Sequence, residues 1–317
     1  MSDIKLFRYG QGGAEALQGR TASLERHLHT LMEQHMECFL GVRFLAHEYE
    51  TGTVHGGRID SLGLDENNCP VIIEYKRHTN QNVINQGLYY LDWLLDHRAE
   101  FKLLVLERYG RELAGNIEWS NTRVLCIAGD FTKFDEHAVA QIGRNIELIR
   151  YKYFSDDLLM LEWVNPAGRP AAAPRIPAAT LAAAVEAAVE SAGDDNEHNA
   201  GNAASSVLTA AMPAGQQQLY DELRDFIFSL GDDVNVRELQ LYVAFTRLKN
   251  FACVRPMKGW FKVWLRLDPD SVTLEEDFSR DVRAVGHWGT GDLELSLRTL
   301  DDLDKARPLI ERAYQES

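Results

Sequence analysis

The chain has 317 residues, of which 45% are hydrophobic and 26% charged, so it has the composition of a globular protein with room for about two domains. Its 33 Lys and Arg against 48 Asp and Glu give a net charge of −15, which excludes a histone-like protein that coats DNA with positive charge. No run of about 18 apolar residues and no apolar secretion signal occurs, and the cysteines form no Cys-x-x-Cys pair. We therefore expect a cytoplasmic protein with neither a membrane-spanning helix nor a disulfide framework.

Residues 1–164 predict an α/β domain. Apolar residues at three- and four-residue spacing predict helices at 24–40, 81–96 and 135–143. Short apolar or alternating runs predict strands at 42–49, 57–64, 71–76, 101–106, 123–128, 146–153 and 158–164. The segment Asp-Glu-Asn-Asn at 65–68 predicts the turn of a hairpin. Together these elements predict a mixed sheet with helices packed on it.

The rest of the chain divides into a linker and a second domain. Residues 165–217 are rich in Ala, Pro and Gly and contain few large apolar side chains to bury, which predicts a linker with a short alanine-rich helix at 180–192. Residues 218–317 again carry periodic apolar patterns. They predict a small α+β domain with helices at 219–230 and 303–314 and strands at 260–267 and 293–298.

Charged residues lie within two of the predicted strands, 57–64 and 71–76. Asp60 ends Gly-Arg-Ile-Asp, and Glu74 and Lys76 end Val-Ile-Ile-Glu-Tyr-Lys. Because side chains alternate along a strand, Glu74 and Lys76 leave the same face of the sheet, and the hairpin brings Asp60 beside Glu74. Half-burying two carboxylates is unfavourable unless they have a partner.

A hard divalent cation is the partner that this group fits. Asp60, Glu74 and the carbonyl of Tyr75 would bind Mg²⁺ or Mn²⁺, and Lys76 would orient or deprotonate the attacking water and offset negative charge. His47, Glu48 and Glu50 lie on the preceding strand and either extend this site or form an ordinary exposed edge. The alternative interpretation of Glu74 and Lys76 is a surface pair whose charges are simply solvated.

The ordered pattern resembles the PD-(D/E)xK nuclease superfamily, and within it the archaeal and actinobacterial mismatch- and branch-directed endonucleases. In that family an Asp follows Gly-x-Ile and an apolar strand ends Glu-x-Lys-Arg, the positions that Asp60, Glu74 and Lys76 occupy here. Gln86 and Tyr90 match a Gln-x-x-x-Tyr pattern of the next helix, which places both on one helix face. Ile59 stands where the superfamily name has Pro.

A further match lies in the first predicted helix, where Glu25 stands in a Leu-Glu-x-x-Leu context that supplies an auxiliary acid in the family. The resemblance implies a restriction-endonuclease-like mixed sheet and a metal-dependent DNA endonuclease of repair or defence that acts as a homodimer. Residues 1–164 contain no counterpart of that branch's N-terminal DNA-binding barrel, which puts mismatch recognition in doubt. The alternative is a catalytically silent nucleic-acid-binding or regulatory protein that keeps the nuclease fold.

The second domain contains a basic segment, 241–267, that has no acidic residue. Its aromatic residues, Tyr242, Phe245, Phe251, Trp260, Phe261 and Trp264, are interleaved with its cations, which is typical of a nucleic-acid surface. The alternation at 260–266 is equally typical of a half-buried strand. The candidate nucleic-acid contacts are Arg58, Arg77, Lys249, Arg255, Lys258 and Lys262. A protein partner that binds residues 218–317 is the other interpretation.

Overall fold

The computed structural model describes residues 4–10, 13–21, 25–76, 83–155, 157–164, 212–285, 287 and 289–317. The chain forms two compact units, Met1–Ile117 with Thr122–Ala167, and Glu118–Asn121 with Gly168–Ser317. The helix predicted at 180–192 and most of the predicted linker lie outside the described residues, so the predicted domain boundaries stay a prediction. None of the described helices has the length and apolar character needed to cross a membrane.

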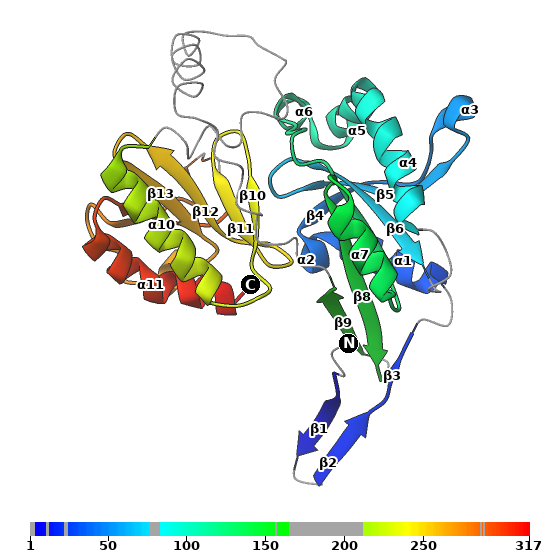
Figure 1. The fold of residues 1–317 in the computed structure, drawn as a ribbon, viewed down its shortest axis with the longest axis horizontal. Coiled ribbons are helices and arrows are strands. Elements are labelled where there is room, and N and C mark those ends of the chain that lie inside the picture. The colour runs from blue at the N-terminus through cyan, green and yellow to red at the C-terminus, as the bar shows by residue number, and fades with distance from the viewer. Residues whose placement is uncertain are drawn as a thin grey trace. The chain divides into compact units, whose positions relative to one another are not determined.

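The first unit is built on a seven-stranded mixed sheet (Figure 1). Its order is β3 (Gly19–Arg20), β8 (Ile146–Phe154), β7 (Arg123–Ala128), β6 (Pro70–Lys76), β5 (Arg58–Asp65) and β4 (Val42–Glu50), and β9 (Leu158–Trp163) pairs with β8. Strands β4, β5 and β6 are antiparallel neighbours, whereas β6, β7 and β8 run parallel. This arrangement confirms the predicted mixed α/β sheet.

Helices cover both faces of this sheet. They are α1 (Glu25–Gln34), α2 (Met36–Leu40), α3 (Gly52–His55), α4 (Val83–Asp96), α5 (Arg98–Tyr109), α6 (Arg111–Gly115) and α7 (Lys133–Gln141). Helices α1 and α2 bury their apolar side chains against the face that carries Ile73 and Tyr75. Helix α4 lies on the opposite face, where a Cβ at Gly87 would come within 2.5 Å of a Val124 methyl carbon. Glycine at 87 therefore lets α4 approach the sheet closely.

Two predictions for this unit differ from the structure, and one hairpin was not predicted. Residues 101–106 belong to α5, not to a strand, because Phe101 and Val105 are buried four residues apart while Leu103 and Leu106 are exposed. The helix predicted at 24–40 is broken at His35, whose φ of −124° is not helical. A hairpin of β1 (Leu6–Gly10) and β2 (Gly13–Leu17) was not predicted.

A buried ion pair fixes the hairpin that joins β5 to β6. The Asp65 carboxylate accepts hydrogen bonds from the amides of Asn67 (2.8 Å) and Cys69 (2.9 Å) and forms an ion pair with Arg123 of β7. The side chains of Arg123 and Asp65 are 3% and 2% exposed, and Glu147 lies 3.5 Å from the Arg123 guanidinium. The Arg123 guanidinium therefore binds two carboxylates, Asp65 and Glu147, and the three residues come from three separate parts of the chain.

Replacing Arg123 with Met should lower the free energy of unfolding by about 3–5 kcal/mol, because Asp65 and Glu147 would keep buried charges without their partner. Arg111→Met on α6 is the matched control, since Arg111 is exposed and its loss should change stability by no more than about 0.5 kcal/mol. Urea unfolding followed by circular dichroism measures both. Equal stabilities of the two variants would contradict a structural role for the buried pair.

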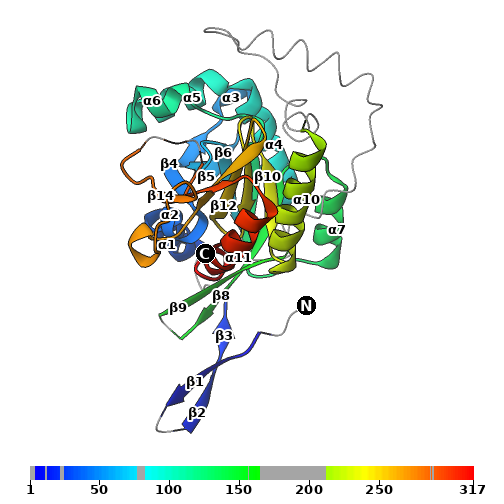
Figure 2. The ribbon, with the colours of Figure 1, turned by 90° about the vertical axis from the view of Figure 1, so that its left-hand side faces the viewer.

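The second unit is a six-stranded antiparallel sheet with two helices (Figures 1 and 2). Its order is β10 (Asn235–Glu238), β11 (Val243–Thr246), β12 (Asn250–Met257), β13 (Trp260–Leu265), β15 (Leu293–Leu297) and β14 (Ser279–Asp281). Helices α10 (Ala214–Ser229) and α11 (Leu300–Gln315) share one apolar core with the sheet. The predicted helices and strands of this unit are confirmed, whereas β10, β11, β12 and β14 were not predicted.

Candidate active site

The carboxylates of Asp60 and Glu74 are linked to each other's strands where β5 and β6 part. Regular pairing of the two strands ends at Ser61 and Ile73. Beyond that pair, the amide of Asp60 donates to Glu74 Oε1 at 3.2 Å, and the amide of Tyr75 donates to Asp60 Oδ2 at 3.0 Å. Each carboxylate thus has one oxygen bound to the other strand and keeps a second oxygen.

The second oxygen of Glu74 is buried. Glu74 is 0% exposed, and its Oε2 accepts no hydrogen bond from any described residue. Burial, and next the negative charge of Asp60, raise the pKa of Glu74 to about 8, although the hydrogen bond from the Asp60 amide and the charge of Lys76 act in the opposite direction. The fold therefore holds a carboxylate that would be stabilised by a further positive charge.

Lys76 lies at the last position of β6, on the same face of the sheet as Glu74. Its side chain is half-buried and its charge reaches Glu74. Asp60, Glu74 and Lys76 are therefore brought together as the sequence predicts. The backbone of Tyr75 contacts Asp60 through its amide, and the predicted role of its carbonyl as a ligand stays a prediction. Arg77 lies outside the described residues.

Helix α4 braces the start of β5. The Tyr90 hydroxyl accepts hydrogen bonds from the Arg58 amide at 3.1 Å and from Gln86 Nε2 at 3.2 Å. Gly57 makes this contact possible, because a Cβ there would lie 2.5 Å from the Tyr90 ring. Tyr90 therefore contacts the backbone of the strand that carries Asp60, and Gln86 acts on that strand through the Tyr90 hydroxyl.

Glu33, an acid of helix α1 that was not predicted for the site, contacts these strands. Glu25 is the first residue of α1, and its side chain is outside the description. Glu33 of the same helix instead accepts a hydrogen bond from the Ser61 hydroxyl at 2.6 Å and lies 2.8 Å from His47 Nδ1. Ser61 directly follows Asp60, on the opposite face of β5. The sequence pattern gave no signal for Glu33, because only the packing of α1 on the sheet brings it to Ser61.

The residues of β4 do not extend the pair of carboxylates. His47 contacts Glu33, and Glu48 forms an ion pair with Arg58 at 3.2 Å. Among the described residues, no group of three or more His, Cys, Asp or Glu side chains is arranged to hold a metal ion. The donor set that remains is two carboxylates with one uncommitted oxygen each, which fits a hard cation that keeps most of its water ligands.

The basic segment of the second unit is not one stacking surface. Five of its six aromatic residues, Tyr242, Phe245, Phe251, Phe261 and Trp264, are buried, and only Trp260 keeps part of its ring exposed. Lys249 and Lys258 flank opposite ends of β12, a strand of about 26 Å at the usual rise per residue. The arrangement therefore contradicts base stacking along the whole segment and leaves Arg255, Trp260 and Lys262 as neighbours on the sheet.

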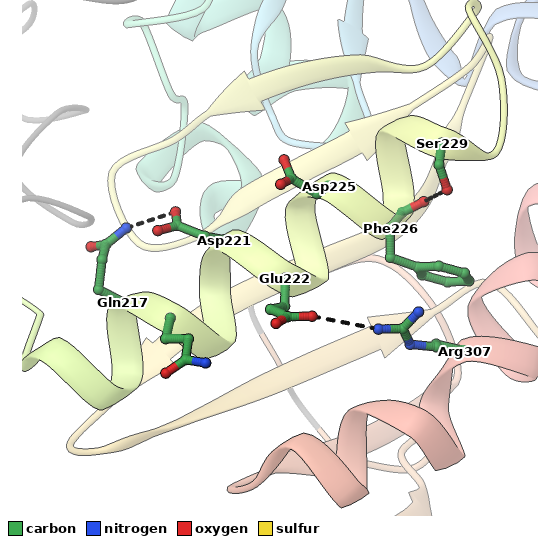
Figure 3. Close-up of a pocket in the computed structure, with 8 residues that line it drawn as sticks. Gln217, Asp221, Glu222, Asp225, Phe226, Ser229 and Arg307 are labelled. Carbon is green, nitrogen blue, oxygen red and sulfur yellow. Dashed lines mark hydrogen bonds and ion pairs between the residues drawn. The ribbon is translucent and has the colours of Figure 1, made fainter.

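A hollow of about 720 Å³ lies elsewhere, along α10 (Figure 3). Its lining includes Asp221, Glu222 and Asp225, and Arg307 of α11 lies 3.7 Å from Glu222 and stacks on Phe226. No residue predicted for the site lines this hollow. It opens widely on the surface and holds neither a buried unpaired acid nor a candidate nucleophile, so we assign it no chemistry.

Sequence comparison matches this chain to one protein family and one relative, and the name of neither states an activity. The family described as Domain of unknown function (DUF5655) matches residues 205–317. An uncharacterized protein of Haemophilus influenzae is 26% identical over 318 residues, which cover 99% of this chain and 100% of that protein. That relative therefore aligns with both units of this chain.

Two solved structures are also similar to part of this chain. A repair endonuclease from Pyrococcus abyssi matches 41% of this chain and 49% of its own, with 18% identity and a TM-score of 0.27. A complex of EndoMS with double-stranded DNA matches 41% of this chain and 47% of its own, with 19% identity and a TM-score of 0.25. The chain thus spans about half the length of each. With scores this low, we draw nothing from either about the activity of this chain.

The raised pKa of Glu74 predicts an unusual pH dependence of stability in metal-free protein. Folded Glu74 holds its proton up to about pH 8, whereas the unfolded chain releases it near 4.5, so stability should fall as pH rises across that window. Between pH 5.5 and 8.5 the loss should be about 3 kcal/mol relative to Glu74→Gln, which has no proton to release. Urea unfolding in EDTA measures the difference, and parallel pH curves for the two proteins would contradict the assigned burial.

Proposed function

We propose that this chain is a divalent-metal-dependent nuclease that hydrolyses phosphodiester bonds, with DNA as its substrate in repair or defence. One observation carries the proposal: Glu74 Oε2 is buried without a hydrogen bond, beside Asp60, on strands that the two carboxylates themselves tie together. Leaving a buried carboxyl oxygen without a hydrogen bond is unfavourable, and carboxyl groups with a raised pKa cluster at sites that bind a metal or react.

Asp60 and Glu74 would hold the cation, which is Mg²⁺ or Mn²⁺ because both donors are hard oxygens. When bound, such a cation supplies positive charge to phosphate oxygens and lowers the pKa of a water molecule. Asp60 and Glu74 are fixed before any cation binds, because each already accepts a backbone amide of the other strand. This preorganisation spares the site the entropic cost of ordering its ligands.

Lys76 would act on the reacting groups. Its ammonium lies on the same face as Glu74 and close enough to lower that residue's pKa. In this position it orients the attacking water and offsets the negative charge that builds on the phosphate in the transition state. Gln86 and Tyr90 support the site indirectly, since Tyr90 holds the β5 backbone two residues before Asp60.

Asp60→Ala and Lys76→Ala should each reduce cleavage about 10²- to 10⁴-fold, as expected when a catalytic group is lost. The assay follows single-stranded, duplex and branched DNA, and RNA, in Mg²⁺ or Mn²⁺, with EDTA as the metal-free arm. Lys102→Ala on the exposed surface of α5 is the matched control and should cleave at the wild-type rate.

Cleavage that survives Asp60→Ala, or no cleavage of any of these substrates by the wild-type protein, would contradict the nuclease assignment. Nucleic-acid binding that is unchanged in EDTA, without turnover, would instead favour a catalytically silent binding protein with the same fold.

A further inference from the structure

The sheet of the second unit has one face covered by helices and one that no described helix of the unit covers. Side chains alternate along each strand, and Val254, Phe261 and Leu295 point into the core shared with α10 and α11. The residues between them, including Arg255, Lys262 and Glu294, leave the opposite face. Figures 1 and 2 both show α10 and α11 on the same side of this sheet.

Part of that opposite face is closed by the chain itself. The ring of His287 stacks on Trp264 at 5.9 Å, and a Cβ at Gly289 would meet both Trp264 and Cys253. This connection, between β14 and β15, explains why Trp264 and Cys253 are buried although they face away from the helices. The open part lies beside it, toward the turn that joins β12 and β13.

The open part is basic, and we define it as the basic sheet face: Arg255, Trp260, Lys262, Arg280 and Arg298. The Glu294 carboxylate on this face is 3% exposed and accepts hydrogen bonds from Trp264 Nε1 at 2.9 Å and Arg280 Nε at 2.8 Å. Lys262 lies 3.4 Å from the same carboxylate. Two of the four cations thus share one buried acid, and the face keeps an excess of positive charge in a chain whose net charge is −15.

Two of these cations are directly opposed. Arg255 of β12 and Lys262 of β13 are paired across the two strands, an arrangement that destabilises a sheet because like charges face each other. No described residue forms an ion pair or hydrogen bond with the Arg255 guanidinium. A polyanion bound along the strands would relieve this repulsion, since each phosphate can lie between the two cations.

An aromatic ring stands at the edge of the same face. The Arg298 guanidinium lies 5.2 Å and the Lys262 ammonium 6.0 Å from the centre of the partly exposed Trp260 ring. Cations that flank an aromatic ring bind an unpaired strand well, because bases stack on the ring while phosphates meet the charges. A duplex cannot use the ring in this way without unpairing a base.

We infer that the basic sheet face binds a single-stranded segment of nucleic acid. The inference rests on the proposed function for its substrate class and gives the second unit a role, which is to hold an unpaired strand of the nuclease substrate. The charge would attract the backbone of any sequence, so the face contributes affinity and a preference for unpaired structure rather than sequence recognition.

Binding can be tested apart from cleavage by using the full chain with Asp60→Ala in EDTA. Fluorescence anisotropy with a labelled single-stranded oligodeoxynucleotide, and with its duplex, gives affinity at several salt concentrations. Arg255→Glu should weaken single-strand binding at least about tenfold and lower the salt slope by about 1, because one phosphate contact is lost. Trp260→Ala should weaken single-strand binding about tenfold and duplex binding little.

Lys305→Glu is the matched control, since Lys305 lies on α11 and its ammonium contacts Glu275 at 3.0 Å. It makes the same charge change as Arg255→Glu on the helix-covered side and should bind like the parent. Arg255→Glu places a carboxylate opposite Lys262, so the sheet should stay folded, which circular dichroism verifies. Equal single-strand affinity of Arg255→Glu, Trp260→Ala and Lys305→Glu would overturn the inference, as would equal losses for duplex and single strand after Trp260→Ala.

The two proposals fail separately. If the protein cleaves nucleic acid but Arg255→Glu and Trp260→Ala leave single-strand binding unchanged, only the present inference is contradicted. A protein that loses single-strand binding in Arg255→Glu but never cleaves contradicts only the nuclease assignment.

Discussion

The candidate site depends on two crossed hydrogen bonds, one from the Asp60 amide to the Glu74 carboxylate and one from the Tyr75 amide to the Asp60 carboxylate. Strand pairing stops at Ser61 and Ile73, and beyond it each carboxylate replaces a backbone acceptor for the opposite strand. Two carboxyl groups are thereby held side by side in a place where one of them is fully buried, so desolvation and repulsion both oppose the ionisation of Glu74. The same two bonds set the positions of Lys76, the next outward-facing residue of β6, and of the strand start that Tyr90 braces.

The sequence predicted this part of the structure because its signals are local. Gly-x-Ile-Asp begins one strand and Glu-x-Lys ends the next. A turn of four polar residues makes the two strands a hairpin, so Asp60 and Glu74 must meet. The contacts of Glu33 with Ser61 and of Tyr90 with the Arg58 amide depend on how helices pack on the sheet, which periodicity does not encode. Residues 101–106 were assigned wrongly because a short apolar run fits a strand and a helix equally well.

The second unit shows the same limit in another form. The alternation along 260–266 is typical of a half-buried strand, and β13 lies there. Only the structure separates the aromatic residues of the core from the partly exposed Trp260. Charge gives the reverse lesson, since cations far apart in the sequence, such as Lys262 and Arg280, meet at Glu294 because β15 lies between β13 and β14 in the sheet. A chain that is acidic as a whole can therefore offer a local surface to a polyanion.

Calorimetric titration of the metal-free protein with Mn²⁺ at pH 7 tests the central claim most directly. Because the pKa of Glu74 is raised to about 8, binding of one cation at Asp60 and Glu74 should expel about one proton, measured from the change in heat between buffers of different ionisation enthalpy. The account predicts one site per chain, with proton release lost in Glu74→Gln and binding lost in Asp60→Ala. Absence of binding, or equal binding by Asp60→Ala, would contradict it.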